Sequence, residues 1–251
     1  MGKIYVFVNQ KGGVGKTTSA INIGAYLAEA GKKTLLVDFD SQGNMSSGVG
    51  LSNEKPTLYE VMAGQVTAAQ AVRHTAVNGL DAIPASVDLS GAAIELVGQE
   101  ERDFFLKKSL APLKDKYDYI LIDCPPSLGI LTLNGLAAAD AVLIPMQCEY
   151  FALEGISLLL QTVKNVQKTT NTSLTIGGIF FTMYDSRTRL AQEVVSQVKA
   201  YFGNAVFNTI IPRNVRLSEA PSHGMPICKY DPNCQGARSY KSLAEEVILR
   251  G

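Results

Sequence analysis

The chain has 251 residues, of which 46% are hydrophobic and 18% charged, and its formal net charge at pH 7 is zero. This composition excludes a disordered or collagen-like chain, and the length suits a single α/β domain that spans residues 1–251. No apolar run approaches the roughly 18 residues of a membrane-spanning helix, and the N-terminus does not resemble a signal peptide. The cysteines lack a paired C-x-x-C spacing. We therefore expect a cytoplasmic protein with reduced thiols and no membrane partner.

The charges are unevenly distributed along the chain. Acidic residues outnumber basic ones over residues 1–150, whereas basic residues outnumber acidic ones over residues 185–251. A net charge of zero does not by itself indicate nucleic-acid binding. The mildly basic C-terminal part nevertheless permits a local contact with an anionic surface.

A glycine-rich segment lies close to the N-terminus, between two predicted elements. The apolar run at residues 4–8 predicts a buried strand, and residues 20–30 predict a helix that Gly31 ends. Strand, glycine-rich turn, Lys-Thr and helix is the order of a phosphate-binding loop, in which backbone N–H groups and the helix N-terminus surround an anion. Lys16 is then expected to reach the β- and γ-phosphates, and the Thr17 hydroxyl to bind Mg²⁺. The residues expected to hold the nucleotide phosphates are Lys11, Gly12, Gly13, Val14, Gly15, Lys16, Thr17 and Thr18.

The start of this loop departs from the common pattern. Gln10 stands where the usual loop has glycine, and a second lysine, Lys11, follows it. One interpretation is a solvated loop lysine. The other, which the whole string K-G-G-V-G-K-T favours, is the signature lysine of the deviant Walker A motif. With this string the chain resembles the ParA/MinD group of ATPases, and the resemblance implies that Lys11 reaches across a nucleotide sandwich dimer to the partner's phosphates.

Two carboxylates end the next predicted strand, residues 33–40. Asp38 and Asp40 are two residues apart, so both side chains point the same way from the strand and are expected to face the nucleotide at the carboxyl edge of the sheet. The alternative is an exposed pair at a strand end. The family resemblance implies that Asp40 positions or activates the attacking water, and Asp38 is expected near the metal.

A third carboxylate follows the most apolar strand of the middle region. Residues 57–75 are predicted to be helical, residues 80–84 to form a short strand, and residues 86–116 to be mostly helical. Residues 117–123 then predict a buried strand that delivers Asp123 to the phosphate site, where a Walker B acid binds Mg²⁺ directly or through water. The expected metal-site residues are Thr17, Asp38 and Asp123.

The C-terminal half contributes candidate base and DNA contacts. Strands are predicted at residues 141–145, 174–184 and 206–212, with a long helix at residues 152–167 between the first two. The segment after residue 212 resembles the family's adenine-side loop, which implies that Pro212 and Asn214 flank the base. Basic side chains on either side of the last strand face either solvent or DNA phosphates, and these are Arg187, Arg189, Arg213 and Arg216.

The alternation of strands and helices predicts a doubly wound, mostly parallel α/β sheet flanked by helices, with ligands at the carboxyl ends of its strands. The phosphate loop, the Asp38/Asp40 pair and Asp123 all fall on that edge. The chemistry they predict is Mg²⁺-dependent phosphoryl transfer from ATP to water, with Lys16 and the loop amides stabilising the transferring group.

The resemblance extends over nearly the whole chain. It includes the strings V-D-F-D-S-Q-G-N, D-C-P-P-S-L-G, Q-C-E-Y-F-A-L-E-G and I-P-R-N-V-R-L-S-E-A-P-S-H-G. Together these are similar to the chromosomal ParA/Soj partition ATPases. That resemblance implies an ATP-dependent homodimer, non-specific binding of double-stranded DNA by the dimer, stimulation of hydrolysis by a ParB-like protein, and a nucleoid-associated protein in the cytoplasm.

Other functions remain open at this level. A MinD-like membrane-cycling ATPase, or another ATPase that positions a protein cargo, shares the same site, although the short acidic end of the chain argues against a membrane helix. An iron–sulfur reductase of this fold requires cysteine ligands for which Cys124 has no evident companion. A DNA-binding regulator without enzyme activity has no need for Lys11 and Asp40 together.

Overall fold

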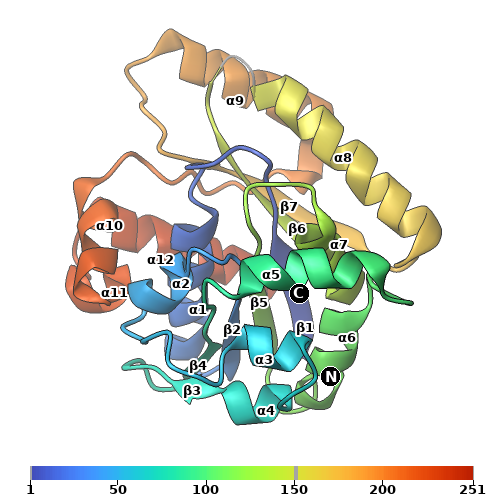
Figure 1. Cartoon of the computed structure of the whole chain (residues 1–251). Coiled ribbons are helices and arrows are strands. Elements are labelled where there is room, and N and C mark those ends of the chain that lie inside the picture. The colour runs from blue at the N-terminus through green and yellow to red at the C-terminus, as the bar shows by residue number, and fades with distance from the viewer. Residues whose placement is uncertain (1, 150–151, 251) are drawn as a thin grey trace.

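The computed structural model describes residues 2–149 and 152–250 of the chain. Within these residues the strands form one sheet of seven, in the order β3-β4-β2-β5-β1-β6-β7 (Figure 1). Every neighbouring pair is parallel except β3 and β4, which pair antiparallel at one edge. The strands are β1 (Lys3–Phe7), β2 (Thr34–Asp38), β3 (Arg73–His74), β4 (Leu80–Ile83), β5 (Tyr119–Asp123), β6 (Ala141–Gln147) and β7 (Thr175–Thr182). The predicted fold class is confirmed.

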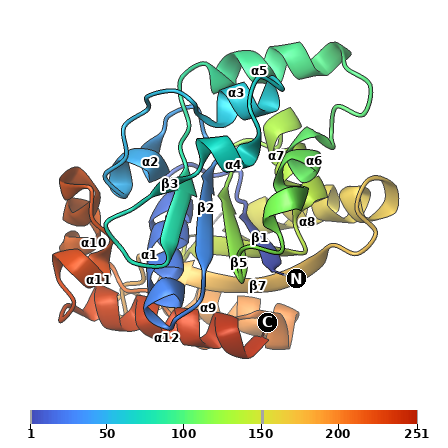
Figure 2. The same ribbon diagram turned by 90° about the horizontal axis from the view of Figure 1, so that it is seen from below.

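Helices cover both faces of the sheet, because the strand side chains alternate between two apolar clusters (Figure 2). One cluster joins Tyr5 and Phe7 to α1, α2, α10, α11 and α12, and the other joins Ile4 and Val6 to α3, α5, α6, α7, α8 and α9. The helices are α1 (Lys16–Glu29), α2 (Asn44–Gly48), α3 (Leu58–Met62), α4 (Ala68–Ala71), α5 (Leu89–Glu95), α6 (Phe105–Leu110), α7 (Ile130–Ala138), α8 (Ala152–Thr169), α9 (Arg189–Phe202), α10 (Val215–Glu219), α11 (Ile227–Tyr230) and α12 (Gln235–Arg250).

The centre of the sheet positions the candidate site. β1 lies between β5 and β6, so the connection from β1 through α1 to β2 runs to one side of β1 while β6 lies on the other. The register pairs Phe7 with Asp123 and Asp38 with Asp123. The carboxyl ends of β1, β2 and β5 therefore meet at one edge, which is where doubly wound sheets bind ligands.

Two predicted helical regions are interrupted in the structure. Residues 57–75 form the short helices α3 and α4 and then the edge strand β3. Each helix begins with its own capping box, Thr57 with Glu60 and Thr67 with Gln70, and Gly64 breaks the chain between them in a left-handed conformation, with φ of 69°. Residues 86–116 are likewise broken after a 3₁₀ turn at Leu96–Gly98, where Gln99 is extended and Glu101 has φ of 54°.

The predicted strand at residues 206–212 is wrong. This segment makes only the isolated bridges of Val206 with Ile179 and of Pro212 with Tyr184. Between them, the N–H groups of Asn208 and Thr209 donate to the carboxylate of Glu246 on α12 at 2.9 Å and 2.7 Å. A side chain from a distant helix thus takes the donors that a strand would use.

No helix in the described part of the chain is both long and apolar enough to cross a membrane. Residues 150 and 151 belong to the sequence stretch Q-C-E-Y-F-A-L-E-G, which resembles the family, and lie outside the described residues.

Candidate active site

The loop between β1 and α1 is shaped to surround an anion. Gly13 and Gly15 are left-handed, with φ of 73° and 85°, a conformation that favours glycine. Gly15 is the N-cap of α1 and supplies no side chain, so the first N–H groups of the helix are left for a ligand. A cavity of about 440 Å³ opens over this turn, and the residues of the loop that line it are Gly12, Gly13, Gly15, Lys16, Thr17 and Thr18.

The carbonyl groups of the same loop are held by side chains from the ends of two strands. Gln147 at the end of β6 donates from Nε2 to the Gly13 carbonyl at 3.0 Å. Thr182 at the end of β7 donates from Oγ1 to the Val14 carbonyl at 2.8 Å. Backbone carbonyls need such partners when water is excluded, and tying them down fixes the orientation of the peptide groups. Neither residue was among the predicted site residues, although both are polar residues at the carboxyl ends of apolar strands.

Lys16 and Asp123 are two buried ionisable groups beneath this loop. Lys16 is 6% exposed and Asp123 is 1% exposed. Burial lowers the pKa of Lys16, while Asp123 opposes that effect. Burial and then the neighbouring Asp38 hold the pKa of Asp123 well above its usual range, and Thr17 and Lys16 act in the opposite direction. Each group therefore compensates part of the other's desolvation.

The carboxylate of Asp123 suits a divalent cation. Both of its oxygens are buried, and neither accepts a hydrogen bond from any of the described residues. The nearby Thr17 hydroxyl does not meet the geometry of a hydrogen bond to them either. A buried carboxylate in that state is costly, and a cation removes the cost. Among the described residues, no three or more histidine, cysteine, aspartate or glutamate side chains come together so that they could hold a metal ion by themselves. Mg²⁺ typically uses one or two protein oxygens and completes its shell with phosphates and water, so the Thr17 hydroxyl and Asp123 fit that ion.

Asp38 has its hydrogen bonds supplied by the protein. Ser46 on α2 donates to it from N at 2.8 Å and from Oγ at 2.6 Å, and the Asp40 N–H donates at 3.3 Å. Burial raises the pKa of Asp38 to about 6 in spite of the Ser46 bonds. These contacts suit a residue that positions α2 beside the metal site better than one that gives both oxygens to the metal.

Asp40 lies in the same cavity as the phosphate loop. It is half-buried, and its carboxylate accepts the N–H of Gln42 at 3.1 Å, which begins the turn into α2. The structure therefore brings Asp40 and Lys16 to one space from two different strand ends.

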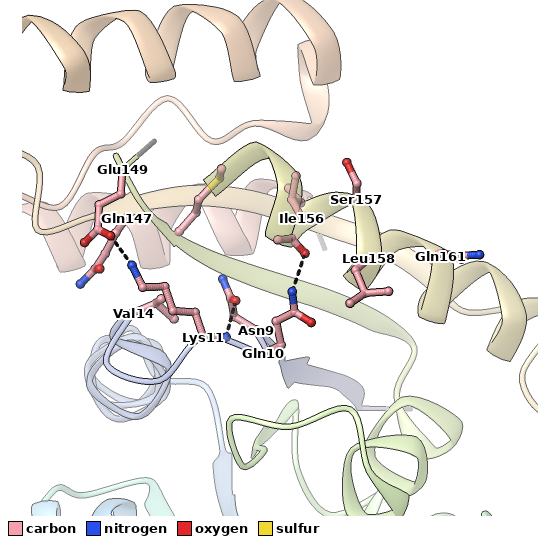
Figure 3. Close-up of a pocket in the computed structure, with 12 residues that line it drawn as sticks. Asn9, Gln10, Lys11, Val14, Gln147, Glu149, Ile156, Ser157, Leu158 and Gln161 are labelled. Carbon is pink, nitrogen blue, oxygen red and sulfur yellow. Dashed lines mark hydrogen bonds and ion pairs between the residues drawn. The ribbon is translucent and has the colours of Figure 1, made fainter. Parts of the chain in front are cut away.

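Lys11 points away from the loop it belongs to. Its ammonium group forms an ion pair with Glu149, which follows β6, and both side chains are about half exposed (Figure 3). The Lys11 N–H also donates to Asn9 Oδ1 at 3.0 Å. A second cavity, of about 600 Å³, lies beside this pair and continues to the first turns of α8 at Ile156 and Leu158. Because exposed ion pairs are worth at most about 1 kcal/mol, Lys11 is free to change partners.

A smaller cavity, of about 240 Å³, adjoins the phosphate loop at Gly15 and Thr18. The structure brings Pro212 and Asn214 to it, together with Thr18, Met183 and Tyr240. Met183 has φ of 50°, an unusual conformation for a large side chain. Its sulfur accepts a hydrogen bond from Gln147 Nε2 at 3.0 Å. The predicted base-flanking residues Pro212 and Asn214 thus share one cavity next to the phosphate loop.

The four predicted DNA-contacting arginines are exposed, and they lie on two segments. Arg187 pairs with Asp185 at 2.7 Å, Arg189 with Glu193 at 2.8 Å and Arg216 with Glu219 at 2.9 Å. Arg187 lowers the pKa of Asp185 to about 2, and Arg213 contributes to that shift, so Arg187 and Arg213 both lie near Asp185.

Comparison with known proteins places this site in a family. The family model described as "AAA domain" matches residues 2–176. The chain is 70% identical over 250 residues to "Chromosome-partitioning ATPase Soj" of Treponema pallidum, covering 100% of this chain and 98% of that protein. It is 53% identical over 253 residues to "Sporulation initiation inhibitor protein Soj" of Bacillus subtilis, covering 100% of both.

A solved structure connects the fold with its ligands. The chain matches a crystal structure from Mycobacterium smegmatis named cobyrinic acid a,c-diamide synthase, with bound ADP and magnesium. The TM-score is 0.86, the sequence identity 37%, and the match covers 99% of this chain and 94% of that one. This agrees with the prediction of ATP and Mg²⁺ as cofactors. With full-length identity of this order to named Soj proteins, the chain belongs to the ParA/Soj family of chromosome-partitioning ATPases.

Proposed function

We propose that the chain is a single-domain, Mg²⁺-dependent ATP hydrolase that dimerises with ATP, binds double-stranded DNA without sequence preference as the dimer, and releases it when a ParB-like protein stimulates hydrolysis. The observation that carries this proposal is the cavity shared by the loop amides, buried Lys16 and Asp40, beside the unpartnered carboxylate of Asp123. In the cell this makes it a cytoplasmic, nucleoid-associated protein.

The proposed hydrolysis depends on positioning and charge. The loop amides and Lys16 bind the β- and γ-phosphates, and Thr17 and Asp123 hold Mg²⁺, which neutralises phosphate charge when it is bound. Asp40 accepts a hydrogen bond from the attacking water and orients it in line. Pro212 and Asn214 flank the adenine in the smaller cavity.

Dimerisation supplies the remaining cation in this proposal. Lys11 leaves Glu149 and contacts the phosphates bound to the partner subunit, so turnover depends on assembly. The cavity beside Lys11 and the 51% exposed Leu158 give this face room for a second copy of the chain. Arg187, Arg189, Arg213 and Arg216 then contact DNA phosphates from each subunit.

The alternative is a membrane-cycling or protein-cargo ATPase with the same nucleotide site. The packing of α12 weighs against a membrane helix there, because Tyr240, Leu243 and Val247 bury its apolar face. Arg250 is also held, donating to the Val206 carbonyl at 2.9 Å and lying 4.0 Å from the centre of the Phe207 ring.

One experiment separates these functions. Asp40→Ala protein is titrated with duplex DNA of unrelated sequences across a salt series, first with ATP and then with ADP, and its dimerisation is followed by light scattering. We expect tight, salt-sensitive and sequence-indifferent binding with ATP alone. Asp115→Ala, which removes an exposed acid elsewhere, should behave as the unmodified protein. A confirmed ATP dimer that does not bind DNA would contradict the partition function and favour the alternative.

A further inference from the structure

The helical segment at residues 87–98 carries an apolar stripe that nothing in the described chain covers. It consists of α5 with the turns on either side; it lies in front of the sheet near the middle of Figure 1 and at the top edge of Figure 2. Its inner face is buried in the core through Leu89 and Leu96. On its outer face Val87, Ile94 and Val97 are 69%, 78% and 60% exposed.

Ile94 lies on α5, Val87 in the turn before it and Val97 in the 3₁₀ turn after it, and the three form a seam with near-helical spacing. Positions seven and then three residues apart lie on one side of a helix, which is the spacing of a two-helix interface. Gly91 lies on the same side, and a Cβ added there would meet only the end of the Glu95 side chain, at 3.8 Å. A partner backbone therefore has room to approach the middle of the seam. Single exposed apolar residues are ordinary, but an aligned set of this kind marks an interaction surface.

The surroundings of the seam are acidic. From residue 86 to residue 104 the only basic residue is Arg102, and the acidic ones are Asp88, Glu95, Glu100, Glu101 and Asp103. Asp88 is 3.6 Å from the ammonium of Lys55, which is closer to Glu60, at 2.9 Å. Glu95 accepts a hydrogen bond from Tyr59, a neutral group that leaves the carboxylate charge in place. Glu101 also forms an ion pair with Lys108, so the acidic excess over residues 86–104 is offset in part by the lysines at 55 and 108 and remains net negative.

This charge decides between the possible occupants. Nucleic acid and anionic membrane surfaces are repelled by it, and a second copy of the chain would bring like charges together across a shared seam. A helix with an apolar stripe flanked by lysine or arginine is complementary in both respects. We propose that residues 87–97 dock a cationic amphipathic helix of another protein.

The surface is separate from the nucleotide cavity but connected to it. The Ala85 N–H, just before the segment, donates to Ser46 Oγ at 3.0 Å, and Ser46 Oγ donates to Asp38 at 2.6 Å. The docking proposal uses no residue of the ATPase site and does not rest on the proposed partition function.

The test uses the full chain and two fluorescently labelled probe peptides. Binding of each peptide to the chain is measured by fluorescence anisotropy. Both peptides carry leucine at heptad positions a and d, and the flanking positions are lysine in one and glutamate in the other. We expect the lysine peptide to bind at least tenfold more tightly than the glutamate peptide, and Ile94→Asp to weaken that binding about tenfold or more. Reversing both flanking charges with Asp88→Lys and Glu95→Lys should reverse the preference.

The control is Leu249→Asp, which places the same charge at an 85% exposed leucine on α12 and should leave peptide binding unchanged. Thermal unfolding and basal ATP turnover should be the same for Ile94→Asp and the control. Equal binding of the two peptides, or undiminished binding to Ile94→Asp, would overturn the proposal. So would nucleotide-free self-association that Ile94→Asp abolishes, because the occupant would then be a second copy.

Discussion

Two regions of the molecule are held together in opposite ways. We call the phosphate loop, with the residues that support it and Asp123 beneath it, the phosphate cradle. We call the exposed region that carries Arg187, Arg189, Arg213 and Arg216 the arginine surface. In the cradle, Lys16 and Asp123 are almost completely buried, and Thr182 reaches the Val14 carbonyl from 168 residues further along the chain. On the arginine surface the closest ion pairs are local, as with Arg189 and Glu193 four residues apart. One region is held by long-range contacts in the core and the other by neighbours in sequence.

This difference explains why only the cradle has a recognisable pattern. A buried charge or carbonyl without its partner costs several kcal/mol, so residue types and spacings there are tightly constrained. Exposed ion pairs are worth about 0–1 kcal/mol each. An arginine that contacts DNA and one that only contacts water therefore look the same until binding is measured.

The largest expected effect comes from removing the cradle's buried cation. Lys16→Ala takes away the charge that compensates Asp123 and that would meet the phosphates, so we expect ATP affinity to fall about a hundredfold or more. Calorimetric titration with a non-hydrolysable ATP analogue measures this. Lys33→Ala, at an exposed lysine, is the matched control. Affinity within threefold of the unmodified protein would remove Lys16 from the site.

Lys11 tests the same contrast within the phosphate loop, because it is the exposed one of the loop's two lysines. Lys11→Ala should bind ATP nearly normally but fail to form the ATP dimer, as seen by light scattering. Glu149→Gln releases Lys11 from its ion pair and should strengthen the dimer, by no more than about fivefold because the pair is half exposed. A Lys11→Ala protein that is dimeric with ATP would contradict the trans role of this lysine.

The arrangement of the site was largely predictable because parallel strands end at a common edge. Asp40 and most of the loop, residues 12, 13 and 15–18, line one cavity, as their positions after β2 and β1 require. The partners of the loop carbonyls were not predicted, since a glutamine or threonine at a strand end has no distinctive spacing. The same holds for Glu246, whose contact with residues 208 and 209 replaces a strand, because that contact depends on how α12 packs.

The predicted helix boundaries over residues 57–75 were wrong for a related reason. The capping boxes at Thr57 and Thr67 were visible in the sequence and mark two separate helix starts. Hydrophobic periodicity alone runs through both and suggests one helix. The exposed seam of α5 also resembles an ordinary amphipathic pattern, and only the packing shows which apolar residues are left outside.

A smaller effect is expected from the support of the cradle. Thr182→Val keeps the shape of the side chain but leaves the Val14 carbonyl without its donor, at a cost of about 1–3 kcal/mol. We expect ATP affinity to fall about tenfold and Thr182→Ser to restore it. Thr34→Val is the control, since Thr34 is also buried and donates to a carbonyl, that of Lys32 at 3.1 Å. If both variants lose stability and neither loses affinity, Thr182 does not position the loop.

The smallest single effects are expected on the arginine surface. Using the Asp40→Ala dimer with ATP, alanine at Arg187, Arg189, Arg213 or Arg216 should each weaken DNA binding a few-fold. The slope of affinity against salt should fall by about one for each phosphate that the variant no longer neutralises. Arg102→Ala, in the acidic segment, is the control.

Asp185→Asn sharpens this test, because it frees the Arg187 guanidinium from its closest carboxylate and should increase DNA affinity. An unchanged salt slope in an arginine variant would assign that side chain to solvent. The order of the slopes would then show which part of this surface meets the phosphates, which is the information that local ion pairs do not carry.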